Sequence, residues 1–149
     1  MEKIAVFVND AEFARHVLQP MLDGAEPTHW ILVGCPPALT RHIGRWVSQA
    51  ARQAWRERWG AEVFARLEPE LTARAGSQVE KLLPRRPLAE ISARLQARLP
   101  GVRLLDARRP RLGHVDEPLT ATQPPVGIGR ESGVVAAATG LAAMLALAD

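Results

Sequence analysis

The 149-residue sequence contains a single cysteine, Cys35, and no tyrosine, and aromatic residues make up only 5% of it. One cysteine excludes a disulfide within the chain and any cysteine-rich metal site, and it suits a reducing compartment such as the cytoplasm. Only five consecutive apolar residues precede Asn9, so no secretory signal peptide is expected.

Long hydrophobic runs are also scarce. The longest, residues 133–148, contains Gly140 and many alanines and is shorter than the roughly 20 residues that a membrane span requires. It reads instead as a helix that is apolar on all sides and therefore buried inside a protein. The sequence thus predicts a cytoplasmic protein without membrane association.

Net charge is small, because 19 Lys and Arg residues stand against 16 Asp and Glu residues, which gives +3. This excess alone does not indicate a nucleic acid or a membrane surface as partner. Almost all of the cations are arginine, which GC-rich coding would explain. The positions of the arginines, not their number, must therefore carry any functional argument.

Apolar runs alternate with helical patterns along the chain. Buried strands are predicted at residues 4–8, 29–35, 77–84 and 102–107, and helices begin near residues 11, 38, 88 and 133. This alternation predicts an α/β fold with an open, mostly parallel four-stranded sheet flanked by helices, of the flavodoxin or Rossmann type. We expect one domain over residues 1–149, ending in the buried apolar helix.

The helix expected at residues 38–59 has one apolar face and an opposite stripe of arginines that includes Arg52 and Arg56. Trp55 and Trp59 fall beside the arginines and need a cover, either a short helix after Gly60 or a second subunit of a homo-oligomer. Interleaved Arg and Trp also resemble a platform for single-stranded nucleic acid. Nearby acidic residues argue against nucleic acid, so we favour a structural role for the stripe.

Charged residues follow three of the four predicted strands, and Cys35 with Pro36 ends the strand predicted at residues 29–35. In an open parallel sheet, ligands bind beyond the carboxyl ends of the strands. The side chains expected there form a basic crevice with one acidic group, suited to a phosphate-bearing ligand. They are Asn9, Asp10, Cys35, Arg85, Arg86, Arg108, Arg109 and Arg111.

A glycine-rich turn, GIGRESG, precedes the apolar C-terminal segment. Free N–H groups and the positive end of a helix could seat a phosphate here. Alternatively, the glycines serve only to let the helix enter the core, because the spacing matches no known phosphate-binding motif. The candidate ligand-binding residues of this turn are Gly127, Gly129, Arg130, Ser132 and Gly133.

Catalysis and metal binding find little support. The four histidines are scattered, and only His114 with Asp116 suggests a metal pair, for which a solvated loop is the simpler interpretation. Cys35 has no histidine at a recognised spacing and is expected to be a small buried residue. We assign no catalytic or metal-binding residue and do not favour an enzyme.

Two stretches, IAVFVNDAEFARHVL and QVEKLLPRRPLAEISARLQARLPGVRLLDARRPRLG, resemble the universal stress protein family in layout. The resemblance implies a small stress-response α/β protein that often forms homodimers and, in some members, binds ATP or AMP. It also implies that Asp10, at the end of the first strand, contacts the nucleotide; capping of the next helix is the alternative role.

This sequence departs from the family in two respects. The glycine spacing of its nucleotide-binding members is missing, and so is the fifth strand that commonly takes part in dimerisation. We therefore expect a nucleotide or another phosphate-bearing small molecule at the carboxyl edge. The alternative is a non-catalytic homo-oligomeric interaction protein without a small ligand.

Overall fold

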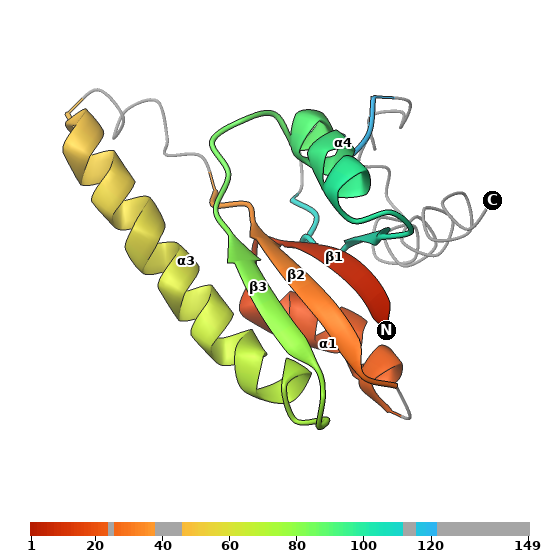
Figure 1. The fold of residues 1–149 in the computed structure, drawn as a ribbon. Coiled ribbons are helices and arrows are strands. Elements are labelled where there is room, and N and C mark those ends of the chain that lie inside the picture. Colours follow the sequence, from red (N-terminus) through yellow and green to blue (C-terminus); the bar gives the residue numbers. More distant parts are fainter. Residues whose placement is uncertain (24–25, 38–45, 112–115, 122–149) are drawn as a thin grey trace.

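The computed structural model describes residues 1–23, 26–37, 46–111 and 116–121. These residues contain one open sheet of four parallel strands in the order β3-β2-β1-β4 (Figure 1). The strands are β1 (Glu2–Val8), β2 (Thr28–Gly34), β3 (Gln78–Leu82) and β4 (Arg103–Asp106). The predicted α/β class is confirmed, whereas the predicted C-terminal helix lies outside the described residues.

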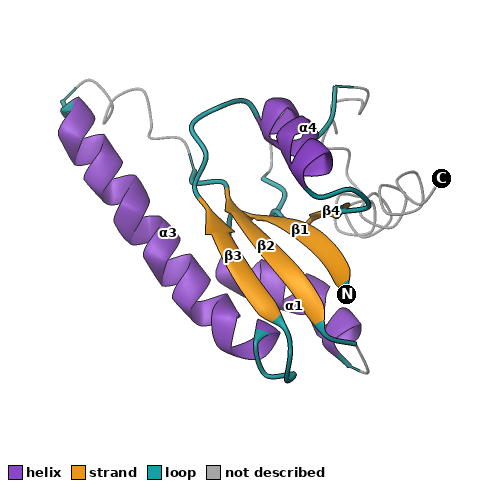
Figure 2. Cartoon of the chain, viewed as in Figure 1, coloured by secondary structure: helices purple, strands orange, loops and turns teal. Residues whose placement is uncertain are grey.

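The helices cover both faces of the sheet (Figure 2). The two central strands are therefore apolar and buried over residues 4–8 and 30–33. On one face, α1 (Ala11–Leu22) and α3 (Gln49–Leu71) pack over Val6, Val8 and Leu32. On the other face, α4 (Leu88–Arg98) packs over Phe7 and Val33. The chain changes face at α4 because β4 adds on the far side of β1, as right-handed crossovers require.

The long helix α3 differs from its prediction. Its first turn is capped by Ser48, whose Oγ accepts a 3.1 Å hydrogen bond from the Ala51 N–H, and residues 46–48 are not helical. The helix then continues through Gly60 and past Pro69 to Leu71 instead of ending near residue 59. Burial of its second half against the sheet explains this continuity, because that half supplies the contacts to the core.

The predicted inner and outer faces of this segment are also wrong. Ala50 and Ala54, which belong to the apolar face of the predicted helix, are exposed, whereas Arg56 and Trp59, expected on the opposite side, are half-buried. The buried positions of the second half, Val63, Phe64, Leu67 and Leu71, repeat at helical spacing, and Trp59 and Arg56 extend the same stripe. The second half of α3, which packs on the sheet, thus determines which face of the whole helix points towards the sheet.

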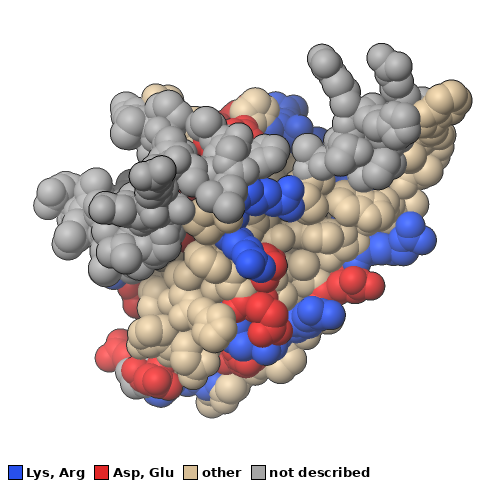
Figure 3. All heavy atoms as spheres, turned by 180° about the vertical axis from the view of Figure 1, so that it is seen from behind, with Lys and Arg blue, Asp and Glu red and all other residues tan. Residues whose placement is uncertain are grey.

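Surface charges are mixed in sign. Seen from behind, basic and acidic side chains lie next to one another over the described surface (Figure 3). Arg15, for example, lies 2.9 Å from Glu70 and 3.3 Å from Glu12. Such interleaving does not create the single-sign stripe that a nucleic acid requires. In the part of the chain that the structure describes, no helix has the length and hydropathy of a membrane span.

Candidate functional site

A cavity of about 390 Å³ lies at the carboxyl edge of the sheet. The loops that follow all four strands contribute to it, so it occupies the place where open α/β sheets bind ligands. Its volume falls within the range of small-molecule sites. The lining residues are Asn9, Gly34, Cys35, Pro36, Pro37, Arg56, Pro84, Arg85, Arg86, Leu88, Arg108, Arg111, Asp116 and Glu117.

The cavity, which we call the carboxyl-edge pocket, is lined by five arginines and two carboxylates. Three of the arginines are engaged. Arg108 is 7% exposed and forms two hydrogen bonds to Asp106, Nε to Oδ1 at 2.9 Å and Nη2 to Oδ2 at 3.0 Å. Arg56 Nη2 donates to the Pro84 carbonyl at 2.8 Å, and Arg86 Nη1 donates to Glu90 at 2.7 Å.

The other two arginines are Arg85 and Arg111. Both are exposed, and neither forms a side-chain hydrogen bond or ion pair within the described ranges. Their guanidinium groups are free to meet an anion in the pocket, whereas that of Arg108 is already neutralised by Asp106. Among the described residues, the pocket therefore combines three engaged arginines with two, Arg85 and Arg111, that have no partner there.

The protonation states around Cys35 exclude it as a nucleophile at neutral pH. Burial raises the pKa of its thiol to about 12, and the positive charge of Arg108 offsets only part of this effect. Burial alone would lower the pKa of Arg108, but hydrogen bonds and charge from Asp106 outweigh it and leave this pKa raised. The pocket thus holds a neutral thiol beside a permanent cation.

Side-chain alternation decides which strand-end residues reach the pocket. Along β1, Phe7 faces α4 and Val8 faces α1, so Asn9 falls on the α4 side and Asp10 on the α1 side. After β4, the same alternation directs Arg108 into the pocket and Arg109 away from it. Of the five residues predicted at these two strand ends, Asn9, Arg108 and Arg111 line the pocket, and Asp10 and Arg109 do not.

Asp10 caps α1, because its Oδ1 accepts a 3.0 Å hydrogen bond from the Phe13 N–H. Its Oδ2 lies 3.6 Å from Arg109 Nη1. Asn9 joins the ends of β1 and β4 through its side chain: Nδ2 donates to the Arg109 carbonyl at 3.1 Å, and Oδ1 accepts from the Arg109 N–H. The capping role that the sequence suggested for Asp10 is the one its contacts show.

Arg56, Asp116 and Glu117 are the charged pocket residues that the sequence does not predict at this edge. Arg56 is expected on a solvated stripe, but it faces the pocket because the packing of Val63 and Phe64 on the sheet sets the orientation of α3. Glu117 caps α4 from a distant loop, its Oε1 accepting a 2.8 Å hydrogen bond from the Leu88 N–H. No local pattern signals this contact, because 29 residues separate the two partners.

The glycine-rich turn cannot be compared with the pocket. Gly127, Gly129, Arg130, Ser132 and Gly133 lie outside the described residues, as does His114. Within the ranges that the structure describes, no group of three or more His, Cys, Asp or Glu side chains could hold a metal ion.

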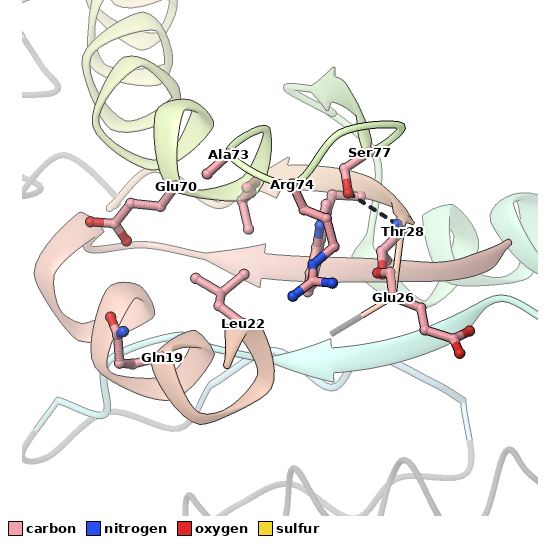
Figure 4. Close-up of a pocket in the computed structure, with 10 residues that line it drawn as sticks. Gln19, Leu22, Glu26, Thr28, Glu70, Ala73, Arg74 and Ser77 are labelled. Atoms are coloured by element: carbon pink, nitrogen blue, oxygen red, sulfur yellow. Dashed lines mark hydrogen bonds between the residues drawn. The ribbon is translucent and has the colours of Figure 1, made fainter. Parts of the chain in front are cut away.

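A second hollow, of about 590 Å³, lies at the opposite edge of the sheet, beside the first residue of β2 (Figure 4). The helices α1 and α3 both end there, and helix C-termini disfavour anions. Two polar groups of Thr28 in its lining already have protein partners. The Thr28 N–H donates to Ser77 Oγ at 3.1 Å, and Thr28 Oγ1 donates to the Glu26 carbonyl at 2.8 Å. A phosphate is therefore better accommodated at the carboxyl edge.

Comparison with known proteins adds no independent assignment. No family model matches this chain, and neither a curated protein nor a solved structure proved significantly similar to it. The resemblance to the universal stress protein family therefore stays a prediction from the sequence.

Proposed function

We propose that this chain binds a nucleotide or another phosphate-bearing small molecule in the carboxyl-edge pocket, as a universal-stress-protein-like domain of the cytoplasm. The observation that carries the proposal is the pair Arg85 and Arg111, two exposed arginines without partners in the described part of the chain, lining a cavity where α/β sheets bind ligands.

Each wall of the pocket suits one part of such a ligand. Arg85 and Arg111 offer guanidinium donors to phosphate oxygens. Asp116 offers a carboxylate that can accept hydrogen bonds from a sugar hydroxyl or a base amine. Pro36, Pro37 and Leu88 form less polar parts of the lining against which a base or sugar can pack. AMP and ATP are therefore the first ligands to test.

The proposed activity is binding without chemistry. The raised pKa keeps the Cys35 thiol neutral, and Arg108 is held by Asp106, so neither is available as a nucleophile or proton-transfer group at neutral pH. A regulatory or stress-response role, in which occupancy of the pocket is the signal, fits this arrangement.

Calorimetric titration of the full chain with AMP, ATP and inorganic phosphate tests the proposal. A hydrogen bond to a charged group contributes about 1.5–3 kcal/mol, and solvent exposure places these two arginines at the lower end of that range. We therefore expect Arg85→Ala and Arg111→Ala each to weaken binding about tenfold.

Arg58→Ala is the matched control, because Arg58 is an exposed arginine of α3 outside the pocket lining. The Arg58→Ala protein should bind AMP, ATP and inorganic phosphate as tightly as the unmodified chain does. Absence of binding by all three compounds at millimolar concentration would refute the proposal, and equal losses in all three variants would show that only overall charge matters.

As a second candidate we propose a homo-oligomeric interaction protein, supported by one observation. Trp46, next to the start of α3, is 82% exposed. The two tryptophans that first suggested an oligomer are instead half-buried within the chain, and Trp59 packs against the core. Trp46 is therefore the residue on which an oligomer should be tested.

A further inference from the structure

The carboxyl-edge pocket already contains a protein anion. The Glu117 carboxylate lines the pocket, and its Oε1 accepts the 2.8 Å hydrogen bond from the first N–H of α4, at Leu88. A helix N-terminus in a pocket lined by arginines also favours a phosphate oxygen. Glu117 thus occupies a position for which a ligand phosphate would compete.

The local sequence explains why a distant residue caps this helix. The residue before α4 is Pro87, which has no side chain able to accept a hydrogen bond, and no side-chain cap forms from it. The first N–H of α4 is therefore open to any anion nearby. Glu117 is exposed, so its carboxylate can leave the N–H for water at little cost.

A buried anchor keeps Glu117 close to the pocket. Two residues further along, Leu119 is 2% exposed and packs with Phe7, Val33 and Leu88 on the α4 face of the sheet. Rotation of the Glu117 side chain therefore does not require residues 116–121 to leave the sheet. The carboxylate acts at a high effective concentration, as an intramolecular competitor.

We propose that Glu117 is an affinity-setting residue, whose carboxylate competes with the ligand phosphate for the Leu88 N–H. This inference rests on the proposed function. It implies that ligands able to place a dianionic phosphate at this point displace Glu117, whereas singly charged anions compete less well with it. Binding would then be coupled to the position of one side chain of the 116–121 segment.

Three variants separate competition from simple charge effects. Glu117→Ala removes the competitor, Glu117→Gln keeps an acceptor for the Leu88 N–H but removes its charge, and Asp116→Asn removes one charge from the same pocket without touching that N–H. In calorimetric titrations with AMP and inorganic phosphate, we expect Glu117→Ala to tighten binding about tenfold and Glu117→Gln less. Asp116→Asn is titrated with inorganic phosphate alone, which lacks the sugar and base proposed to meet Asp116, and should tighten binding least.

The Leu88 amide provides a readout that a structural cap alone would not give. In ¹H–¹⁵N spectra of the unmodified chain, AMP should shift the Leu88 amide resonance as its acceptor changes from carboxylate to phosphate, while the Leu119 amide stays in place. The Glu117→Ala protein should show the phosphate-bound Leu88 shift at lower AMP concentration.

The outcomes distinguish this inference from the proposed function. If the unmodified chain binds AMP or phosphate and Glu117→Ala binds no more tightly, or Asp116→Asn gains as much as Glu117→Ala, the competition is refuted and the pocket stands. If the unmodified chain and all three variants bind none of AMP, ATP and inorganic phosphate at millimolar concentration, both proposals are wrong.

Discussion

Single residues at the carboxyl edge owe their roles to the side of the sheet on which they emerge. Asn9 and Asp10 are neighbours in sequence, but one lines the pocket and the other caps α1. The same holds for Arg108 and Arg109 after β4. The period of two along a strand is sufficient to separate them, so this distinction is present in the sequence once both faces of the sheet are assigned.

Cys35 provides a test of the pocket's interior at the same scale. Its ordinary pKa of 9.0 is raised to about 12 by burial, so the thiolate fraction at neutral pH is smaller than in the unfolded chain. We expect alkylation by iodoacetamide at pH 8 to be slow in the folded protein, to accelerate with rising pH without a plateau below about pH 12, and to become fast in denaturant.

Because Cys35 is the sole cysteine, mass spectrometry reads this reaction without interference. The unfolded chain in denaturant is the control, with a plateau expected near the ordinary pKa. A folded-state reaction that levels off near pH 9 would contradict the burial of this thiol.

At the scale of elements, β2 and α3 approach each other closely at Gly34, which lines the pocket. A Cβ added at Gly34 would lie 3.0 Å from Leu83 Cδ1, 3.1 Å from Phe64 Cζ and 3.2 Å from Trp59 Cζ3. Two of these neighbours are aromatic rings of α3 that pack on the sheet and cannot easily withdraw. We expect Gly34→Ala to lower the free energy of unfolding by about 1–3 kcal/mol.

Gly60→Ala is the matched comparison. Its Cβ would lie 3.3 Å from the side-chain end of Leu83 and in ordinary contact with Phe64 Cε2 at 3.6 Å. A helix interior favours alanine over glycine by about 1 kcal/mol. We expect Gly60→Ala to be nearly neutral in urea unfolding followed by circular dichroism. A Gly34→Ala protein as stable as Gly60→Ala would show that α3 can move away from β2.

The same helix marks the limit of sequence-based prediction at this scale. Four strands and the class of the sheet follow from apolar runs and their alternation with helices, and the structure confirms them. The start and orientation of α3 do not follow from the sequence. Arginine and tryptophan in its first half are compatible with either of two opposite faces packing on the sheet. Only the contacts of Val63, Phe64 and Leu67 with the sheet decide between these faces.

For the whole molecule, the parallel topology of the sheet brings residues that are distant in sequence together in the carboxyl-edge pocket. Arg56, Arg85 and Arg111 come from three separate parts of the chain and meet because parallel strands end at one edge. Arg85 and Arg111 could be placed there from sequence. Arg56 and Glu117 could not, since their positions depend on the orientation of α3 and on a contact between α4 and a distant loop.

The exposure of Trp46 makes the oligomeric state of the whole molecule testable. Trp46 exposes 82% of its surface beside the first turn of α3, and burial of a tryptophan is among the larger contributions to a protein interface. If a second copy covers it, light scattering at tens of micromolar should report a dimer. Trp46→Ala should then shift it to monomer, whereas Arg58→Ala, further along α3, should not. A monomeric unmodified chain under these conditions would remove the case for an oligomer and leave the carboxyl-edge pocket as the functional surface.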